Sequence, residues 1–486
     1  MQIIINNHSF RYEMENIARM FFGGREIEIK FDVAEPTGDY VLTQICPNGE
    51  IFVSVSAGGR YAEKCEKSRS CGENETEWQM AGMLYDCLIE ISGKEQKWGL
   101  LTGVRPTRLV HRMLDEGLAA QEVRQKFLSE YRVSEEKFLL VWQTAQAERP
   151  ILLESKPQDF SLYISIPFCP SRCNYCSFVS GSVEKFASII PQYVEYLAKE
   201  IEDAGNIAKT AGLKLKSVYF GGGTPTTLSA QQLSFLMGKI ADNFDLSAIT
   251  EYTVEAGRPD TVTIEKLRAI KDMGADRISI NPQTFNDDVL KAIGRKHTSK
   301  QTLDAFELAK KIGFKTINMD LIAGLTDDTV ESFINSLETA ISLRPENITL
   351  HTLTVKRAAN LAQMGESTFA NGETPAEKMV GMSRQRLFED GFFPYYMYRQ
   401  KGTLSNLENV GYTLDGHKGY YNIYIMDEVH TIIALGAGAV TKLKAPHSED
   451  IRRVYNYKYP TEYLSGFENI INRKREVLKF YEQYPF

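Results

Sequence analysis

Three cysteines stand close together in the chain, Cys169, Cys173 and Cys176, in the spacing C-x3-C-x2-C. Closely spaced thiolates on a short loop suit an iron–sulfur cluster, because cysteine sulfur holds such clusters. Three ligands would leave one iron of a cubane open to bind and activate a small molecule. A zinc site needs a fourth Cys or His close by, and the next histidine along the chain is His297. Zinc, or three unrelated buried thiols, are therefore the weaker interpretations.

A second candidate segment is the run Gly221-Gly-Gly-Thr-Pro225, which directly follows a β-rich stretch. Glycine lets the backbone approach a ligand closely and adopt φ values that other residues avoid. The alternative interpretation is an ordinary turn from a strand to a helix. Because the cysteine motif precedes this run in the same pattern of strands and helices, we favour a ligand-binding segment.

The elements that must position these residues alternate between strands and helices. Six strands are expected at 161–167, 217–223, 251–257, 277–283, 316–322 and 347–353. Helices are expected between them at 183–210, 229–243, 263–273, 299–312 and 328–343. This alternation predicts βαβ units and a parallel sheet, which can form either a partial barrel or a doubly wound open sheet.

The positions of reactive groups favour the barrel. Each predicted strand ends in one of them, namely the cysteine loop, the glycine run, Glu255, Gln283, Asp320 or His351. In barrels the C-terminal ends of the strands carry the active site. The sequence therefore predicts an α/β fold with a partial (β/α)6 barrel.

Three domains are expected: an N-terminal α+β domain of unknown role at 1–155, the barrel at 156–365, and a mostly helical C-terminal domain covering the substrate at 366–486. The first boundary is placed where Pro150 and Pro157 interrupt a helical pattern. Short antiparallel strands are expected in the N-terminal domain near 2–10, 25–33, 39–46 and 51–55.

Composition and charge narrow the class of protein. The 486 residues suffice for two or three domains, and 43% hydrophobic and 24% charged residues are ordinary for a soluble globular protein. Seven cysteines, an odd number with three in one motif, indicate a reducing cytoplasm rather than a disulfide scaffold. We expect no signal peptide and no membrane span. A net charge of −7 disfavours broad nucleic-acid binding.

The cysteine motif, with Tyr175 just before its last cysteine, resembles the signature of radical S-adenosylmethionine (SAM) enzymes. In that superfamily the open iron of a [4Fe–4S] cluster binds the amino and carboxylate groups of SAM. Electron transfer then produces a 5′-deoxyadenosyl radical. The run Gly221–Pro225 is similar to the glycine-rich segment whose backbone binds the methionine amino group. The resemblance implies both cofactors here, with the three cysteines as metal ligands and, through the cluster, as catalytic residues.

Further motifs resemble the oxygen-independent coproporphyrinogen III oxidase family: Glu255, Arg277–Phe285, Arg295, Asp320–Leu325, and Tyr163 six residues before the first cysteine. The motifs Gly103–His111 and Glu408–Tyr412 are similar to the branch called HemZ, which carries an additional N-terminal domain. The resemblance places nine residues around one or two SAM molecules: Tyr163, Tyr175, Gly222, Gly223, Thr224, Glu255, Gln283, Arg295 and Asp320.

The expected contacts are chemically reasonable. Glu255 and Asp320 would accept hydrogen bonds from ribose hydroxyls or the amino group of SAM. Arg295 would pair with the methionine carboxylate in a bidentate fork. A basic, tyrosine-rich strip could bind the substrate's propionates, although a solvated charged strip is an equal alternative. This strip contains Lys356, Arg357, Tyr395, Tyr396, Tyr398, Arg399 and Lys401.

The resemblance implies a cytoplasmic enzyme that decarboxylates coproporphyrinogen III oxidatively to protoporphyrinogen IX. Its implied partners are a tetrapyrrole and an external one-electron donor of the flavodoxin or ferredoxin type, with no nucleic acid or membrane. Two positions depart from the decarboxylating members, which carry a histidine and a further cysteine where this chain has Ser165 and Phe178. The alternatives are a radical SAM enzyme that methylates haem or opens its ring, and a non-enzymatic haem-binding or haem-delivery protein.

Overall fold

The computed structural model describes residues 1–22, 25–69, 72–177, 180–354, 373–400 and 403–486. The chain divides into two compact units. The first comprises Met1–Trp142, Thr354–Glu377 and Arg399–Leu407, and the second comprises Gln143–Leu353, Lys378–Tyr398 and Glu408–Phe486. Two segments from the C-terminal part of the chain, Thr354–Glu377 and Arg399–Leu407, thus belong to the first unit.

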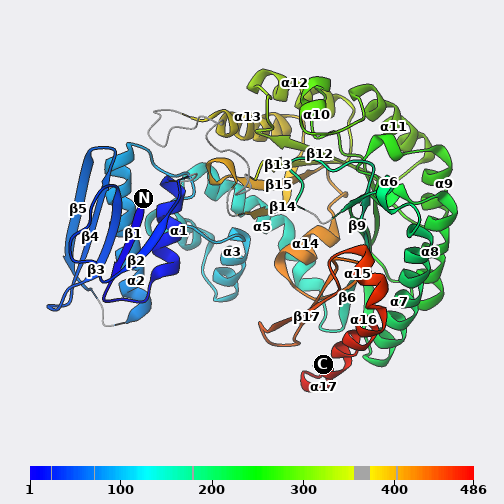
Figure 1. The fold of residues 1–486 in the computed structure, drawn as a ribbon, viewed down its shortest axis with the longest axis horizontal. Helices are drawn as coiled ribbons and strands as arrows, with labels where there is room; N and C mark the ends of the chain where they lie inside the picture. The colour runs from blue at the N-terminus through cyan, green and yellow to red at the C-terminus, as the bar shows by residue number, and fades with distance from the viewer. Residues whose placement is uncertain (23–24, 70–71, 178–179, 355–372, 401–402) are drawn as a thin grey trace. The chain divides into compact units, whose positions relative to one another are not determined.

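The second unit is built on a large open sheet (Figure 1). Among the described residues it has eleven strands in the order β14-β15-β13-β12-β11-β10-β9-β6-β16-β17-β18. Six parallel neighbours form the centre: β6 (Asp159–Ile166), β9 (Lys214–Gly222), β10 (Glu251–Glu255), β11 (Arg277–Ser279), β12 (Thr316–Ala323) and β13 (Asn347–Thr352). Because these match the six predicted strands and the sheet does not close, the predicted partial barrel is confirmed.

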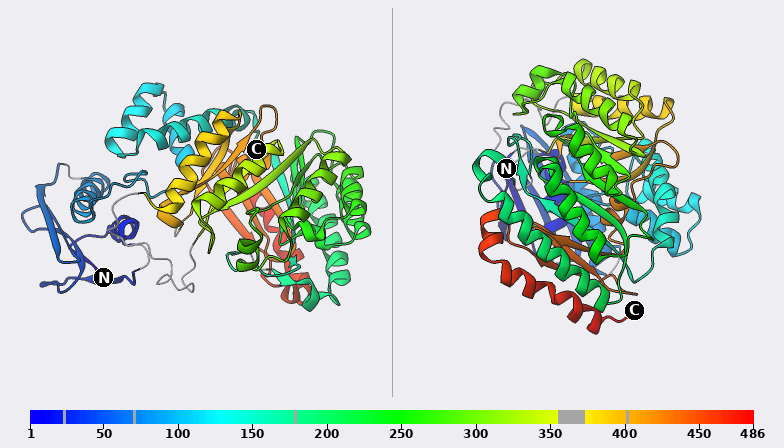
Figure 2. Two further views of the ribbon diagram at one scale, coloured as in Figure 1. Left: turned by 90° about the horizontal axis from the view of Figure 1, so that it is seen from above. Right: turned by 90° about the vertical axis from the view of Figure 1, so that its right-hand side faces the viewer.

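Helices connect the parallel strands and cover the outer face of the barrel (Figures 1 and 2). They are α6 (Val183–Phe186), α7 (Ile190–Thr210), α8 (Ala230–Asn243), α9 (Ile264–Asp272), α10 (Asp287–Ala292), α11 (Ser299–Ile312) and α12 (Val330–Ser342). Several of these helices begin directly after a residue whose side chain caps the helix N-terminus. The Ser229 hydroxyl accepts a hydrogen bond from the Gln232 amide, and Thr298 does the same for Gln301. Such caps satisfy amides that have no partner inside the helix.

The C-terminal segment adds strands to both edges of the barrel sheet. At one edge, β15 (Glu408–Thr413) pairs antiparallel with β13, and β14 (Phe393–Arg399) follows. At the other, β16 (Thr431–Leu435) lies parallel to β6, and β17 (Val440–Lys444) and β18 (Ile451–Tyr455) extend the sheet antiparallel. The helices of this segment are α13 (Pro375–Glu389), α14 (Tyr420–Asp427), α15 (Pro460–Ser465), α16 (Phe467–Lys474) and α17 (Glu476–Gln483). The extension expected to be mostly helical thus also supplies five strands.

A buried ion pair fastens the last helices to the barrel. Glu200 on α7 and Lys474 at the end of α16 have side chains 0% and 1% exposed, with 3.3 Å between carboxylate and ammonium. Glu200 also accepts hydrogen bonds from the Gly436 amide at 2.8 Å and the Tyr463 hydroxyl at 2.7 Å. The carboxylate therefore joins three separate parts of the C-terminal segment.

The first unit carries a five-stranded sheet in the order β2-β1-β3-β4-β5. Its strands are β1 (Gln2–Asn6), β2 (Glu28–Phe31), β3 (Tyr40–Ile45), β4 (Glu50–Ala57) and β5 (Arg60–Lys67). Strands β3, β4 and β5 are antiparallel. The expectation of antiparallel pairing is wrong for β1, which pairs in parallel with β2 and β3. The reason is an unpredicted helix, α1 (Arg11–Phe21), which returns the chain to the start of the sheet.

The described residues after that sheet form α2 (Glu73–Ser92), α3 (Pro106–Asp115), α4 (Ala120–Gln125), which continues as a π-helix (Lys126–Glu130), and α5 (Glu135–Glu154). The expectation that Pro150 interrupts the helix is wrong, because α5 continues past it to Glu154. Ala147 and Ile151, on either side of the proline, pack in a buried cluster with Tyr395 and other apolar residues. This packing outweighs the loss of one helical hydrogen bond at proline.

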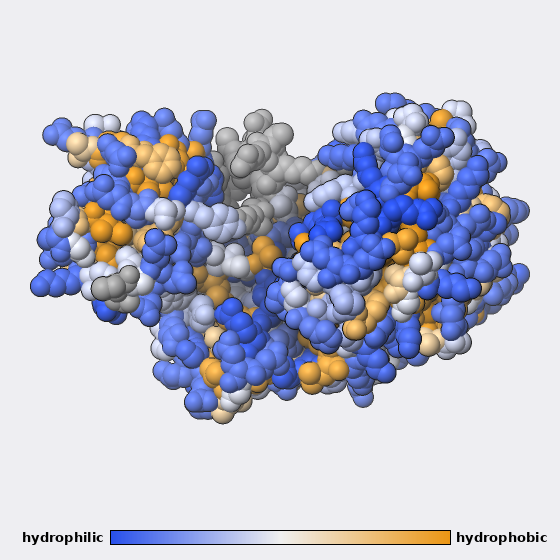
Figure 3. Space-filling model, turned by 90° about the horizontal axis from the view of Figure 1, so that it is seen from below, coloured by the Kyte–Doolittle hydropathy of each residue, from blue (hydrophilic) through white to orange (hydrophobic). Residues whose placement is uncertain are grey.

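Figure 3 shows one face of the molecule, on which hydrophilic residues predominate and hydrophobic residues form separate patches. Scattered apolar residues of this kind are normal on protein surfaces. None of the described helices has the length and apolar character that crossing a membrane requires.

Candidate radical-generating site

The cysteine loop begins in the short strand β7 (Phe168–Cys169), which pairs with β8 (Gly181–Ser182). The Cys176 amide donates to the Cys173 carbonyl at 3.2 Å, which closes the loop on itself. Cys173 is buried, and Cys169 and Cys176 are half-buried. Three hydrogen bonds hold the loop against residues 292–294: Asn174 amide to Ile293 carbonyl, Asn174 side chain to Ala292 carbonyl, and Ser171 hydroxyl to Gly294 carbonyl.

Hydrogen-bond donors lie next to the sulfur atoms of Cys169 and Cys173. The Thr224 hydroxyl is 3.5 Å from the Cys169 sulfur, and the Arg258 guanidinium is 3.9 Å from the Cys173 sulfur. Hydrogen bonds to the sulfur ligands are among the features that tune an iron–sulfur cluster held by cysteine. The surroundings of the loop therefore fit such a cluster.

The glycine run is pressed against the start of the cysteine loop. The amides of Gly223 and Thr224 each donate at 2.8 Å, to the carbonyls of Ile166 and Phe168 respectively. A Cβ on Gly223 would stand 2.6 Å from the Phe168 carbonyl oxygen, and Gly222 has a φ of +103°. Glycine is therefore required at Gly223 by the close approach and is favoured at Gly222 by the positive φ. The amides of Gly223 and Thr224 are used to hold the cysteine loop, so they are not available to a ligand in this structure.

Tyr175, Gln283 and Arg295 come together beneath the loop. The Tyr175 hydroxyl donates to the Gln283 side-chain oxygen at 3.3 Å and accepts from Arg295 at 2.9 and 3.2 Å. The other terminal nitrogen of Arg295 donates to the carbonyls of Gly257 and Asn281, at 3.0 and 2.9 Å. The fork expected to face a SAM carboxylate is thus turned to Tyr175 in this structure.

Glu255 lies beside a stack of tyrosine rings in the interior of the barrel. Tyr219 donates to its carboxylate at 2.5 Å. The Tyr219 ring stacks on Tyr163, with centroids 6.1 Å apart, and on Tyr421 from the C-terminal segment, at 4.4 Å. Burial raises the pKa of Glu255 from 4.5 to about 7, because the hydrogen bond from Tyr219 offsets the desolvation only in part. This carboxyl can therefore hold or release a proton near neutral pH.

Asp320, expected at a strand end, lies inside β12, and it forms a second polar pair with His351 near the end of β13. Their nearest carboxylate and ring atoms are 3.7 Å apart, and Asn318 donates to Asp320 at 2.8 Å. Burial opposes ionisation of both groups, but His351 lowers the pKa of Asp320, and Asp320 raises the pKa of His351. The pair therefore favours a carboxylate beside an imidazolium.

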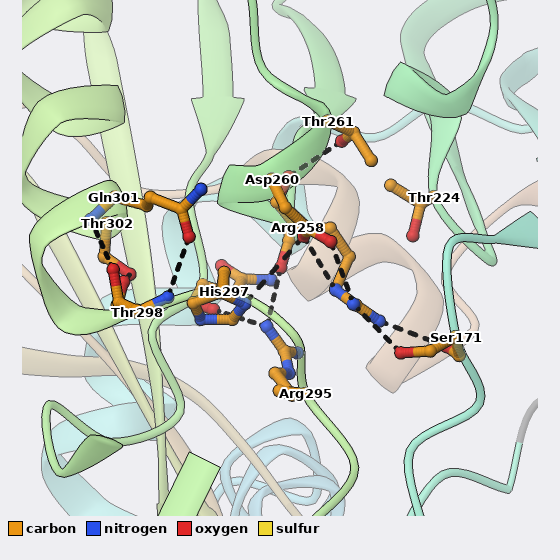
Figure 4. A network of polar contacts seen from close by, with 12 residues as sticks. Ser171, Thr224, Arg258, Asp260, Thr261, Arg295, His297, Thr298, Gln301 and Thr302 are labelled. Carbon is orange, nitrogen blue, oxygen red and sulfur yellow. Dashed lines mark hydrogen bonds and ion pairs between the residues drawn. The ribbon is translucent and has the colours of Figure 1, made fainter. Parts of the chain in front are cut away.

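Behind the cysteine loop lies a polar group that the sequence did not single out (Figure 4). Arg258 and Asp260 form an ion pair at 3.2 Å, and His297 lies 3.9 Å from Asp260. Burial, reinforced by the Arg295 charge, lowers the pKa of His297 to about 3, so its ring is neutral. The sequence feature that could have indicated this group is the pair of opposite charges in Arg258-Pro-Asp260, directly after a predicted strand. Tyr219 and Tyr421 also went unpredicted, since a tyrosine in a strand or helix more often packs in a core.

The expected basic strip does not form an open anion site in the described residues. Tyr395 and Tyr396 are buried. The Arg399 guanidinium donates to the carbonyls of Leu101, Gly103 and Asn406 and lies 4.8 Å from the centre of the Trp98 ring. The other basic members, Lys356, Arg357 and Lys401, lie outside the described residues, as does Phe178.

Comparisons with known proteins agree with this geometry. The model of the radical SAM superfamily matches residues 163–337. The Escherichia coli coproporphyrinogen III oxidase HemN has a similar fold, with a TM-score of 0.50 at 20% identity over 67% of this chain and 72% of that one. The fold and the cysteine loop thus define a radical SAM protein, whose cofactors are a [4Fe–4S] cluster and SAM.

Sequence relatives place the chain more closely. It is 36% identical to the oxygen-independent coproporphyrinogen-III oxidase-like protein HemZ of Bacillus subtilis, over 99% of this chain and 97% of that protein. It is 32% identical to the heme chaperone HemW of Lactococcus lactis, over 65% of this chain and 79% of that protein. The chain belongs to the oxygen-independent coproporphyrinogen III oxidase-like family, in the HemZ branch.

Proposed function

We propose that Cys169, Cys173 and Cys176 hold the [4Fe–4S] cluster and that the nine predicted contact residues surround SAM. All of them belong to the second unit, on the barrel strands and on the loops that follow them, and this supports the assignment. When bound, the cluster and SAM supply a carbon-centred radical that can remove a hydrogen atom from a substrate. In this arrangement Arg295 orients Tyr175 and the loop, and Glu255 and Asp320 provide carboxylates for the polar groups of SAM.

We propose further that the chain decarboxylates coproporphyrinogen III oxidatively. Each turnover removes a hydrogen atom from a propionate, breaks the bond to its carboxylate, and releases carbon dioxide and one electron, which leaves a vinyl group. The electron passes to an acceptor outside the chain, and an external donor of the flavodoxin or ferredoxin type reduces the cluster. The observation that carries this proposal is the whole-length similarity to HemZ.

The interior of the barrel offers groups suited to a tetrapyrrole carboxylate. His351 has a raised pKa and a side chain 27% exposed, and Tyr398 lies 3.5 Å from its ring. A cation with a neighbouring hydroxyl can form charge-assisted hydrogen bonds to a propionate. Tyr421 belongs to the segment expected to cover the substrate and stacks directly on Tyr219. This contact supports the proposal that 366–486 closes over the barrel.

The test is an anaerobic reaction of the reconstituted chain with coproporphyrinogen III, SAM and dithionite, with products identified by mass spectrometry. We expect products that have lost one and two molecules of carbon dioxide, and none with the variant in which all three cysteines are alanine. Cleavage of SAM without any vinyl product would contradict decarboxylation while leaving the radical chemistry intact.

A haem-binding role is the second candidate, which the similarity to heme chaperone HemW favours. Ser165, where decarboxylating members carry histidine, is also occupied here in a structural contact, since its hydroxyl donates to the Ala437 carbonyl at 2.8 Å. Titration with haem, followed by visible absorption and by mass spectrometry of the recovered pigment, distinguishes the alternatives. Stoichiometric binding with unaltered haem supports delivery, and methylated or ring-opened haem supports catalysis on haem.

A further inference from the structure

Arg258 lies directly behind the cysteine loop, three residues after the end of β10 (Figure 4). Its side chain is 3% exposed. One terminal nitrogen donates to the Ser171 carbonyl at 3.1 Å and lies 3.9 Å from the Cys173 sulfur. The other donates to the Ser171 hydroxyl at 3.1 Å. The guanidinium therefore contacts both the backbone of the loop and one of its sulfur atoms.

Asp260 holds this guanidinium from the opposite side. Its two carboxylate oxygens accept from the Arg258 Nε and Nη2 atoms, each at 3.2 Å. A bidentate pair of this kind fixes the plane of the guanidinium. It leaves Nη1, which Asp260 does not engage, directed at the loop. The Thr261 hydroxyl also donates to the Arg258 carbonyl at 2.7 Å, which fixes the turn that carries both residues.

The sulfur atoms of Cys169 and Cys173 consequently differ in their electrostatic surroundings. Cys169 faces the neutral hydroxyl of Thr224, whereas Cys173 faces the buried guanidinium of Arg258 and also interacts with Arg295. Hydrogen bonds to the sulfurs and local charge set the reduction potential of an iron–sulfur cluster. A buried charge acts over this distance more strongly than one in water, because little solvent screens it.

We propose that Arg258 is a positioning residue that raises the reduction potential of the cluster through Cys173, and that Asp260 moderates this effect. The inference rests on the proposed cysteine ligands. Reduction adds one negative charge to the cluster, which the Arg258 cation stabilises and the Asp260 carboxylate opposes. The two residues thus contribute, beside Arg295, to how readily an external donor delivers its electron.

The test is a redox titration of the reconstituted cluster in the full chain, with dithionite and mediators, in which electron paramagnetic resonance measures the reduced fraction. At the wild-type midpoint, Arg258→Gln should lower the ratio of reduced to oxidised cluster about tenfold, which corresponds to about 59 mV for one electron. Asp260→Asn should shift the ratio in the opposite direction. Asp288→Asn removes a carboxylate whose side chain is 91% exposed, and should leave the ratio unchanged.

A purely structural role predicts a different pattern, in which both Arg258→Gln and Asp260→Asn lose cluster and neither moves the potential of what remains. Unchanged potentials, or shifts in the same direction, would overturn the proposal. If the Arg258→Gln variant assembles no cluster, the Asp260→Asn variant alone decides the matter. A cluster potential above that of the wild type supports the proposal, and an equal or lower potential overturns it. Absence of any cluster in the wild-type chain would instead refute the cysteine assignment.

Discussion

The Glu255 carboxyl offers a quantitative test of the interior of the barrel. It lies half-buried among tyrosine rings and accepts a hydrogen bond from Tyr219 at 2.5 Å. Burial raises its pKa from 4.5 to about 7 in the folded chain. The folded protein therefore binds this proton more tightly than the unfolded chain does. Replacing Glu255 by glutamine removes the titration while keeping the size and hydrogen-bonding capacity of the side chain.

The size of the effect on the free energy of unfolding follows from the shift in the pKa of Glu255. A rise from 4.5 to about 7, at about 1.4 kcal/mol for each pKa unit, corresponds to about 3 kcal/mol. Because the folded pKa is raised, this stabilisation is complete below the unfolded pKa and is lost as the pH rises through about 7. Between pH 5.5 and pH 8.5 the wild-type chain should lose about 2 kcal/mol that Glu255→Gln does not lose.

The assay is urea unfolding of the metal-free protein at these two pH values. Circular dichroism follows the unfolding of the helices and strands of the chain, including those of the second unit, which contains Glu255. We expect the difference in unfolding free energy between wild type and Glu255→Gln, measured from this transition, to change between the two pH values.

A matched control is Glu265→Gln at the exposed start of α9. The pKa of Glu265 is lowered by hydrogen bonding to its own backbone amide, so this carboxyl is ionised throughout the range and the substitution should have the same effect at both pH values. A pH-independent difference between wild type and Glu255→Gln would refute the raised pKa, and with it the role of Glu255 as a proton-holding group at neutral pH.

Three further predictions concern other parts of the second unit. Lys474→Met should destabilise it by about 3–5 kcal/mol, because Glu200 is left buried without its partner, whereas Lys479→Met, which removes an exposed pair with Glu476, should have little effect in the same urea titration. Gly223→Ala should reduce cluster incorporation, measured as iron per chain, since its Cβ would stand 2.6 Å from the Phe168 carbonyl, whereas Gly238→Ala on α8 has 3.8 Å of clearance and should be tolerated. Deoxyadenosine should form faster than protoporphyrinogen in one anaerobic assay, because neither Ser165 nor Phe178 can transfer a proton near neutral pH; tight coupling of two decarboxylations per substrate would show that the missing histidine and cysteine are dispensable.

The barrel could be predicted because its signals are local. Hydrophobic runs, caps such as Ser229 and Thr298, and the cysteine spacing all act within a few residues, and the strands formed where these patterns placed them. Reactive groups at strand ends converge in any parallel barrel, so Glu255 and Asp320 could be placed at the same end without knowing their partners.

The remaining features depend on contacts between residues far apart in the sequence. Tyr421 on α14 stacks on Tyr219 of β9, a strand that lies far earlier in the chain. Helix α5 passes Pro150 because Ala147 and Ile151 pack in a buried cluster. Arg295 faces Tyr175 rather than an open ligand site, and no local pattern specifies which way a buried guanidinium turns. Packing at long range decides such cases over local propensity.

The most direct test of the central claim is the cluster content of the wild-type chain and of the variant in which Cys169, Cys173 and Cys176 are all alanine. After anaerobic reconstitution, the wild type should contain about four iron and four sulfide per chain, show broad visible absorption, and give an electron paramagnetic resonance signal on reduction that changes when SAM is added. The triple variant should show none of these. A full cluster in the triple variant, or a wild-type cluster whose signal does not respond to SAM, would contradict the assignment of this loop as the radical-generating site.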